Sequence, residues 1–433
     1  MQSIQDLDSS QDKVERIRKI IVNLCFAFGI LLLTEGALRK WFLAPFQQVL
    51  YFIKDPLVIL SYLLASIAGL WPKGLFFRLS IGMIALTFVV GLFQVLGGIN
   101  SIGSMLLGWR NYCFLIPFAF LMQQCLNGKD LFNLSRYALL TSIPMAVLVF
   151  IQYRSPRGAL VNMMLDEKQA FAYGKLARAS GTFSFTAGHE YYCQAMLAFL
   201  LVCWILPNNV RPVKNPLLWV VAAATVVNIL LNGNRGVFSL CAATWLMSLV
   251  YRLLAAPLWS KRLNLKKAFR LIIPEVLIVL AVCSYSYFFA DALEAMMNRI
   301  IHTERSSVGN AERVYGSLTY VIPALAKIEP LGKGLGLGIS AGRRLAAANS
   351  QFVFEENDLP RVIAEAGYLG ILLILFRFSW GGLIFYGAIK ASRRTGNPFP
   401  LLIASLPVYA SVLSPDQNQL DELPKIRSWN VEA

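Results

Sequence analysis

Residues 79–97, LSIGMIALTFVVGLFQVLG, form a run of nineteen residues that contains no charged side chain. A single helix needs about 20 mostly apolar residues to cross the hydrocarbon core of a bilayer, and this run has that length. Similar runs recur along the chain, and their recurrence predicts the fold class. We expect eleven membrane-spanning helices, at residues 20–38, 56–70, 79–97, 102–126, 137–153, 189–206, 216–231, 236–254, 271–290, 362–388 and 399–413.

The composition of the whole chain agrees with this pattern. Of 433 residues, 57% are apolar and 15% are charged, whereas a soluble domain has about 45–50% apolar and about 25% charged residues. We therefore predict an all-α polytopic membrane protein with about eleven (10–12) helices and one large loop outside the membrane. Its predicted parts are a transmembrane bundle of about nine spans (1–290), a large loop that contains an amphipathic helix at 311–326 (291–361), C-terminal transmembrane helices (362–413) and a polar tail (414–433).

The basic residues indicate on which side of the membrane each loop lies. The chain carries 40 Lys and Arg against 24 Asp and Glu, a net charge of +16. Cytoplasmic loops are enriched in Lys and Arg, and every second short loop is basic when the N-terminus is placed in the cytoplasm. This topology puts residues 154–188 and 291–361 outside and explains the charge without a nucleic-acid partner. The short outer turns carry few cations, which are Arg39, Lys40, Arg110 and Arg235.

Two further patterns bear on possible sites. The seven cysteines lie in or beside apolar runs and none forms a CxxC pair, so neither a zinc site nor a disulfide framework is predicted. Lys54 and Asp55 are adjacent, just before the second run. We interpret them as an ion pair that neutralises itself, with a role in a site as the alternative.

Charged residues at the outer membrane surface are the candidate functional residues, because a charge near hydrocarbon is costly unless it is paired or used. Arg235 lies between Gly233 and Gly236, and a guanidinium there is suited to bind a phosphate or diphosphate through two hydrogen bonds. The alternative is an arginine that anchors a helix end. Arg313 lies in the large outer loop among several other arginines, for which a diphosphate-linked substrate and lipid headgroups are the two alternatives.

Carboxylates and a histidine are the candidates for proton transfer. Residues 355–358, EEND, come just before Arg361 at the start of the tenth run. A partly desolvated carboxylate there could act as a general base, and the alternative is an acidic helix start. His189 follows the segment that begins at Arg178, and it is either a base or a structural histidine.

Four of these segments occur in an order that resembles the O-antigen ligase and polysaccharide polymerase family, which are membrane glycosyltransferases of the GT-C type. The segments are RASGTF (178–183, R..GTF in the family), NRG (234–236, SRG), Arg313 with PLGKGLG (330–336, R…PxGxGxG), and Glu356-Asn357 with EAGYLG (365–370, HN…ExGxxG). The sequence departs from the family pattern at Glu356, where the family has histidine, and at Asn234, where it has serine.

The resemblance implies an enzyme of the bacterial inner membrane. Such an enzyme transfers a polyprenyl-diphosphate-linked glycan to a hydroxyl of a glycan or lipid acceptor at the periplasmic face, without a metal or other cofactor. Arg235 and Arg313 would stabilise the departing diphosphate, and Glu356 would take the proton of the acceptor hydroxyl. These three are the expected catalytic residues. The expected substrate-binding residues are Arg178, Asn357, Asp358 and Arg361.

Two other functions remain open from the sequence. One is a transporter (flippase) for lipid-linked glycans, which would carry charges in the middle of its helices and internal repeats. The other is a non-catalytic membrane protein of envelope polysaccharide assembly. Glu356 in place of the family histidine keeps this second alternative open.

Overall fold

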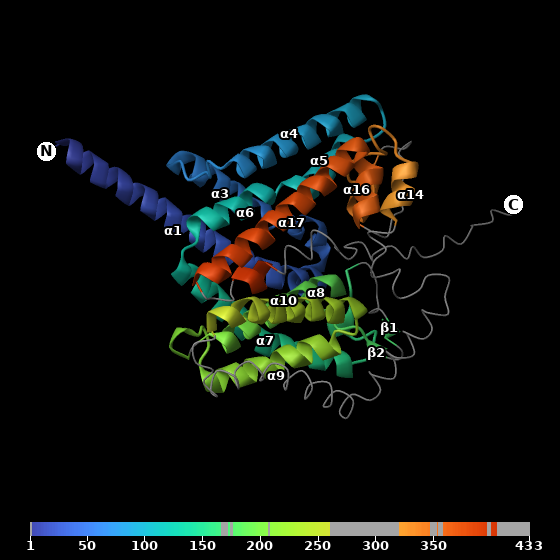
Figure 1. Ribbon diagram of the computed structural model, residues 1–433. Coiled ribbons are helices and arrows are strands. Elements are labelled where there is room, and N and C mark those ends of the chain that lie inside the picture. Colours follow the sequence, from blue (N-terminus) through green and yellow to red (C-terminus); the bar gives the residue numbers. More distant parts are fainter. Residues whose placement is uncertain are drawn as a thin grey trace. The chain divides into compact units, whose positions relative to one another are not determined.

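The computed structural model shows a chain that is mainly helical (Figure 1). It describes residues 2–165, 172–173, 176–206, 208–259, 320–346, 353, 358–395 and 400–404. The chain divides into two compact units. Unit 1 comprises Met1–Phe77, Ile116–Asn310 and Phe378–Val412. Unit 2 comprises Arg78–Leu115, Ala311–Arg377 and Leu413–Ala433.

Unit 1 holds most of the long helices. These are α1 (Gln2–Ala37), α3 (Asp55–Ala68), α6 (Ile116–Cys125), α7 (Gly128–Arg154), α8 (Thr186–Ile205), α9 (Asn215–Leu231) and α10 (Arg235–Trp259). The short elements between them are a π-helix η1 (Leu38–Phe42), η2 (Ala44–Phe46), α2 (Gln47–Leu50), η3 (Leu160–Asn162) and η4 (Asn208–Val210). Strands β1 (Ala172–Tyr173) and β2 (Leu176–Ala177) form a two-stranded antiparallel ladder.

Unit 2 is built from fewer helices. They are α4 (Leu75–Leu96, from Arg78 onward), α5 (Ile102–Cys113), α14 (Val321–Ala326), α15 (Ser340–Arg344), α16 (Asp358–Ala366) and α17 (Tyr368–Thr395, as far as Arg377). Helix α15 packs on α5, and α14 packs on α16. The remainder of α17 belongs to unit 1.

Within the described residues, six helical stretches are long and apolar enough to cross a membrane. They are Gln11–Phe42, Ala44–Ala68, Leu75–Leu96, Ile102–Cys125, Gly128–Arg154 and Tyr368–Arg394. The prediction of a helical membrane protein with several spans is thereby confirmed. The span expected at 189–206 forms as helix α8, but His189, Glu190 and Gln194 make its first half polar. The run at 271–290 and the tail 414–433 lie outside the described residues, as does most of the run at 399–413.

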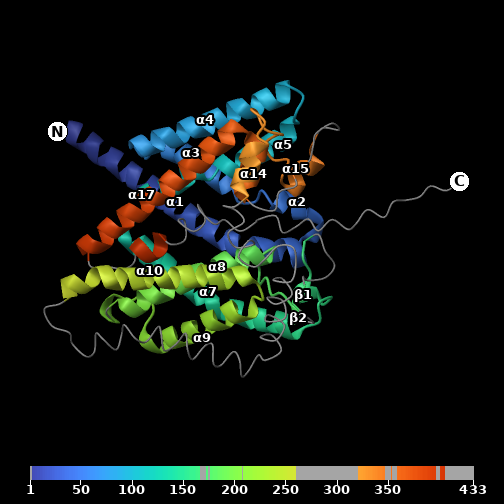
Figure 2. The same cartoon turned by 45° about the vertical axis from the view of Figure 1, so that its right-hand side comes forward.

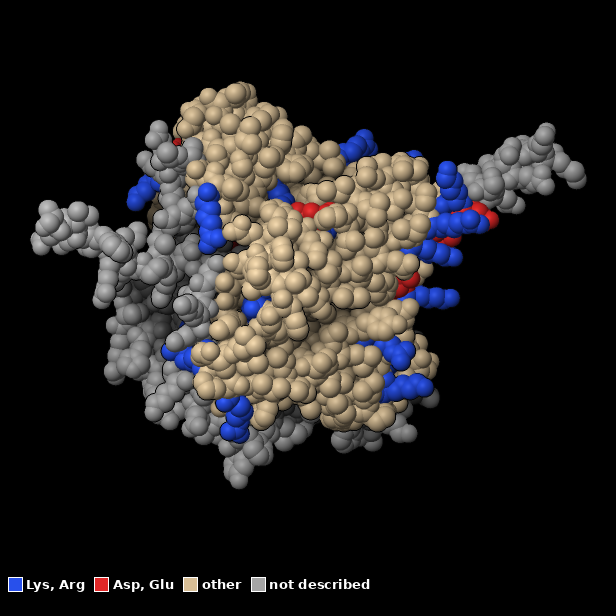
Figure 3. Space-filling view, turned by 180° about the vertical axis from the view of Figure 1, so that it is seen from behind, with Lys and Arg blue, Asp and Glu red and all other residues tan. Residues whose placement is uncertain are grey.

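The outward faces of these helices are apolar, as lipid-facing surfaces must be. Leu63 and Ile67 on α3 are 57% and 69% exposed, and Leu96 at the end of α4 is 82% exposed. The space-filling view likewise shows large areas without a charged side chain (Figure 3). In water such an apolar surface would be unfavourable, so these faces indicate contact with the bilayer.

Helices α7, α8, α9 and α10 pack side by side in unit 1 (Figure 2). Their apolar contacts include Met145, Val149, Tyr192 and Met196. A buried polar side chain links three of them, because the amide nitrogen of Asn228 on α9 donates to the carbonyl of Ser142 on α7, at 3.0 Å, and its oxygen contacts α8. Hydrogen bonds of this kind satisfy polar groups that have no water around them.

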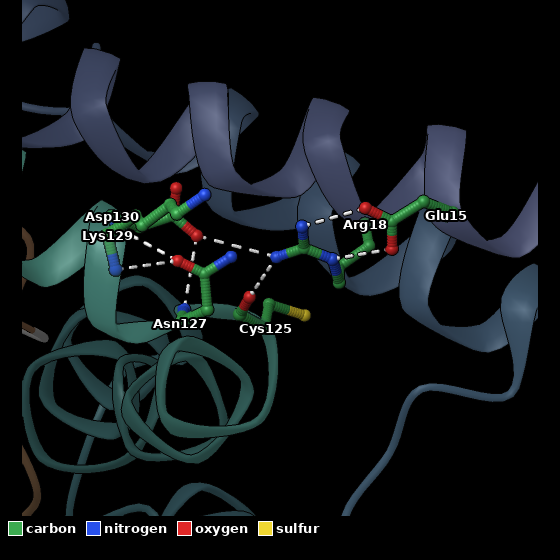
Figure 4. A network of polar contacts seen from close by, with 6 residues as sticks. All are labelled: Glu15, Arg18, Cys125, Asn127, Lys129 and Asp130. Atoms are coloured by element: carbon green, nitrogen blue, oxygen red, sulfur yellow. Dashed lines mark hydrogen bonds and ion pairs between the residues drawn. The ribbon is translucent and has the colours of Figure 1, made fainter.

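A second polar link ties α1 to the turn between α6 and α7 (Figure 4). The guanidinium of Arg18 donates to the carbonyl of Cys125 at 2.7 Å and contacts Asp130 at 3.4 Å. Asp130 also accepts from the backbone N–H of Asn127, whose side chain in turn accepts from the backbone N–H groups of Lys129 and Asp130. This reciprocal capping box explains why α7 begins at Gly128.

The run expected at 362–388 forms two helices rather than one. Helix α16 ends at Ala366 and α17 begins at Tyr368, because Gly367 takes a positive φ of 59° that side chains other than glycine rarely adopt. The backbone N–H of Tyr368 then donates to the carbonyl of Pro330 at 3.2 Å. The charged residues of α16 therefore precede the apolar helix instead of lying within it.

Replacing Asp130 with alanine should lower the stability of the protein, because it removes the Asp130 half of the capping box of α7 and the contact with Arg18. We expect a loss of about 0.5–1.5 kcal/mol, the net range for one intramolecular hydrogen bond, visible as a lower thermal midpoint of the detergent-solubilised chain. Lys129→Ala is the control, since Lys129 contributes only its backbone N–H to the box. Equal midpoints for the two variants would contradict this assignment.

Candidate functional site

A polar cluster of unit 1 forms where α8 and α10 begin and α9 ends. His189, in the first turn of α8, is fully buried. Its Nδ1 lies 3.2 Å from the carbonyl oxygen of Ala179 and 2.8 Å from the amide nitrogen of Asn232, and its Nε2 lies 3.2 Å from Asn228 Oδ1. His189 thus joins the segment 178–183 to the segment 232–236. These contacts favour the structural interpretation of this histidine.

The segment 232–236 is held by its own turn and by a carboxylate. Gly233 has a φ of 71°, and the backbone N–H of Asn234 donates to Asn232 Oδ1 at 3.1 Å. The Asn234 amide donates to Glu190, which is 2% exposed. A carboxylate oxygen of Glu190 also lies where a Cβ at Gly236 would be, so a larger residue at 236 would have to displace this carboxylate. A buried carboxylate therefore sits at the positive end of α10, beside the backbone of Arg235.

The segment 178–183 is fixed from several sides. Gly181 has a φ of 58°, its backbone N–H donates to Gln152 Oε1 at 2.8 Å, and its carbonyl accepts from Gln152 Nε2 at 3.1 Å. Thr182 donates to the carbonyl of Leu33 on α1 at 2.6 Å. The side chain of Arg178, at the start of this turn, is half-buried. These bonds make the turn a rigid part of the cluster.

Cations gather at the end of α1, next to the same turn. Lys40 is 6% exposed and donates to Ser180 Oγ and to the carbonyl of Gly181, both at 3.0 Å. Lys54 pairs with Glu35 at 2.6 Å. The interpretation of Lys54 and Asp55 as a self-neutralising pair was therefore wrong. Folding places the carboxylate of Glu35, near the end of α1, beside the ammonium of Lys54. The residues next to Lys54 in the sequence do not indicate this partner.

Unit 2 contains a separate cluster around Glu365 of α16. The two oxygens of this fully buried carboxylate accept from the backbone N–H groups of Gly336 and Gly338, each at 2.8 Å. The hydroxyl of Tyr112 donates to the same carboxylate at 2.9 Å. Burial raises the pKa of Glu365 above 4.5, while Arg361 and the donated hydrogen bonds lower it, so burial dominates.

Polar side chains of α4 and of the turn after it hold the glycine-rich loop on its other side. Gln94 donates to the carbonyls of Leu331 and Glu365 and accepts from the backbone N–H of Leu335. Asn100 donates to the carbonyl of Leu335 at 2.8 Å. Glycine-rich loops often use their N–H groups to bind phosphate. Here the N–H groups of Gly336 and Gly338 are already bound by a carboxylate of the chain itself.

The other charges of α16 also have partners within unit 2. Asp358 is 7% exposed and accepts from Arg361 and from Arg377, each at 2.6 Å. Arg361 is 5% exposed. Arg377 of α17 therefore serves as a counter-ion of Asp358. A carboxylate in the first turn of a helix interacts favourably with the helix dipole. Because Asp358 is paired with two arginines, it is less available to a substrate.

The structure places the predicted site residues as follows. The segments of Arg178 and Arg235 meet in unit 1, whereas Asp358 and Arg361 pair with each other in unit 2. Arg313, Glu356 and Asn357 lie outside the described residues, and their predicted roles stay predictions.

Sequence reasoning missed several residues of these clusters. Glu190 directly follows His189, and both residues contact the segment 232–236. Their adjacency in the sequence was a signal that Glu190 belongs to the unit 1 cluster. Lys40 was noted only as one of the few outer cations. Tyr112 and Gln152 gave no local signal, because their partners lie 253 and 29 residues away along the chain. Glu365 entered the sequence analysis only as the first residue of the segment EAGYLG, and its partners Gly336 and Gly338 lie 29 and 27 residues away.

No protein-family model matches this sequence, and no curated protein is significantly similar to it. The described residues contain no group of three or more His, Cys, Asp or Glu side chains that could hold a metal ion.

Replacing Gly338 with alanine should destabilise unit 2, because the new Cβ would collide with Glu365 and with the stem of Arg361. We expect a loss of about 1–3 kcal/mol, as for other overpacked sites, measured as the denaturation midpoint of the purified chain. Gly82→Ala on α4 is the matched control, since nothing lies within 4 Å of the added Cβ, and a gain of about 0.5–1 kcal/mol is expected there. A neutral Gly338→Ala would show that the loop is not held as described.

Proposed function

We propose that the protein transfers a glycan from a polyprenyl-diphosphate-linked donor to a hydroxyl of a glycan or lipid acceptor. The reaction takes place at the periplasmic face of a bacterial inner membrane. The proposal includes the topology expected from the sequence, with eleven spans, a cytoplasmic N-terminus and a large outer loop at 291–361.

The observation that carries the proposal is the meeting of two segments in unit 1. Residues 178–183 and 232–236 each contain an arginine and each resemble a motif of the glycan ligases and polymerases. They are far apart in the chain, yet both contact His189 at the end of an apolar helix bundle. A cluster with cations at the end of lipid-facing helices suits a substrate that has a phosphate group and a lipid tail.

The proposed reaction is a single displacement at the anomeric carbon of the donor sugar. The acceptor oxygen forms a bond to this carbon while the bond to the diphosphate oxygen breaks, and the diphosphate leaves with the electron pair. Arg235 and Arg313 stabilise the negative charge that develops on the leaving group. Glu356 accepts the proton of the acceptor hydroxyl, a step worth about 10²–10⁴-fold in rate.

The remaining predicted residues have different roles in this proposal. Arg178 is a binding residue for the diphosphate, because its turn adjoins Lys40 and His189. Asp358 and Arg361 are positioning residues, since both are buried and paired with each other at 2.6 Å. They fix the start of α16, and Asn357 is proposed to bind the substrate, as expected from the sequence.

The test compares a strain that lacks the protein with strains that produce the variant Arg235→Gln or the variant Arg235→Lys. We expect Arg235→Gln to reduce the glycan product at least about 100-fold, the scale for loss of one group that stabilises a developing charge. Arg235→Lys should retain part of the activity. The measurements are the polysaccharide length profile and the lipid-linked intermediates, both with protein levels matched.

Arg154→Gln is the matched control, because Arg154 is an exposed arginine at the end of α7 that lies over the ring of Phe150. We expect wild-type glycan from this variant. Single repeat units on lipid in the deletion strain would indicate a polymerase, and long unattached chains would indicate a ligase. Normal glycan from Arg235→Gln would contradict the transferase, and a donor trapped on the cytoplasmic side would favour a transporter.

A further inference from the structure

The end of α1 carries more positive than negative charge. Arg39 and Lys54 share one carboxylate, that of Glu35, at 3.1 Å and 2.6 Å. Lys40 directly follows Arg39, but its side chain contacts Ser180 and Gly181 instead of Glu35. Among the described residues no carboxylate contacts Lys40, whereas Arg39 and Lys54 both contact Glu35.

The contacts of Lys40 are all with neutral groups. Its ammonium donates to Ser180 Oγ and to the carbonyl of Gly181, and it lies 4.6 Å from the centre of the Trp41 ring. These groups orient the ammonium, but they do not cancel its charge. An ammonium has three N–H donors, so the two hydrogen bonds to the turn leave one donor for another acceptor.

Burial makes the missing counter-charge significant. Lys40 is 6% exposed and Ser180 is 5% exposed. A buried ion that lacks an opposite charge is strongly unfavourable, whereas a neighbouring anion offsets much of that cost. The anion that would complete this site is therefore expected to be a ligand.

The neighbouring segment shows which kind of ligand can reach this place. Phe42, Phe46 and Val49, between α1 and α3, are 73%, 58% and 70% exposed. These apolar side chains belong to the stretch that continues from Lys40 to Lys54, so this end of α1 faces lipid rather than water. Phosphate is the anionic group that most membrane lipids carry, so a lipid phosphate is the anion expected beside Lys40.

We propose that Lys40 binds the phosphate group of a lipid diphosphate, with Ser180 and Gly181 holding the ammonium in place. The choice of a lipid diphosphate over a phospholipid headgroup rests on the proposed function. Lys40 would then be a substrate-binding residue next to the turn of Arg178, and its charge would be left uncompensated until the donor binds.

The first experiment separates ligand binding from a structural role, using the detergent-solubilised full-length chain. Lys40→Met keeps most of the side-chain volume and removes the charge. If Lys40 binds a ligand, we expect Lys40→Met to unfold at a temperature no lower than wild type without ligand, because an unpaired buried charge is gone. If Lys40 only clamps the turn, the midpoint falls or the variant fails to fold, and the proposal is wrong.

The second experiment measures the affinity for farnesyl diphosphate, a short lipid diphosphate. We expect Lys40→Met to bind it about 10- to 100-fold more weakly than wild type, the range for a lost charged hydrogen bond. Lys40→Arg should retain most of the affinity. The matched control is Lys54→Met, which removes a cation that Glu35 already neutralises and should change the affinity less than about threefold.

The source of the phosphate is tested with nanodiscs that contain phosphatidylglycerol. If Lys40→Met weakens the retention of phosphatidylglycerol and leaves farnesyl diphosphate binding unchanged, the site binds phospholipid and the choice of a lipid diphosphate is overturned. Equal affinity of wild type and Lys40→Met for both lipids overturns the proposal entirely. Normal glycan from Arg235→Gln would refute the transferase instead, and the binding data for Lys40 would still stand or fall on their own.

Discussion

A polar group that leaves water must find its partner inside the protein, and this constraint shapes both units of the chain. The cost of an unsatisfied group is largest where helices are surrounded by hydrocarbon. Among the described residues, several buried charged and amide side chains accordingly lie at helix ends and turns, namely Lys40, His189, Glu190, Asn232, Asn234 and Asp358. His189 contacts three segments in unit 1, and Glu365 accepts three hydrogen bonds in unit 2. The packing of the apolar helices brings these helix ends together, and the polar contacts then hold the turns between them in one conformation.

The sequence predicts the apolar helices because the pattern that defines them is local. Runs such as 79–97 are long, free of charge and bounded by polar residues. The break at Gly367 is a different case, since α16 has enough apolar residues to be taken as the start of α17. What ends α16 is a positive φ together with a hydrogen bond to the distant Pro330. The capping box of α7, by contrast, is contained within residues 127–130.

The candidate site is less predictable than the helices because its contacts are long-range. Lys40 and Ser180 are 140 residues apart, and nothing in either local pattern indicates the other. Lys54 shows the same difficulty, because its adjacent Asp55 was the obvious partner and Glu35 is the actual one. Motif order could bring residues 178–183 and 232–236 into one hypothesis. Only the packing of α8 against α9 and α10 shows that a single histidine joins them.

The two clusters differ in how completely their charges are balanced. A cluster whose charges are all paired supports the fold, whereas an unpaired buried charge indicates a place for a ligand. In unit 2, Asp358 pairs with both Arg361 and Arg377. The Glu365 carboxylate accepts hydrogen bonds from two backbone N–H groups of the glycine-rich loop. Such an array needs no further ion. In unit 1, Lys40 is buried against neutral oxygens. Proteins commonly give up stability at the places where they bind ligands. The uncompensated ammonium is therefore more informative about function than the many charges that are already paired.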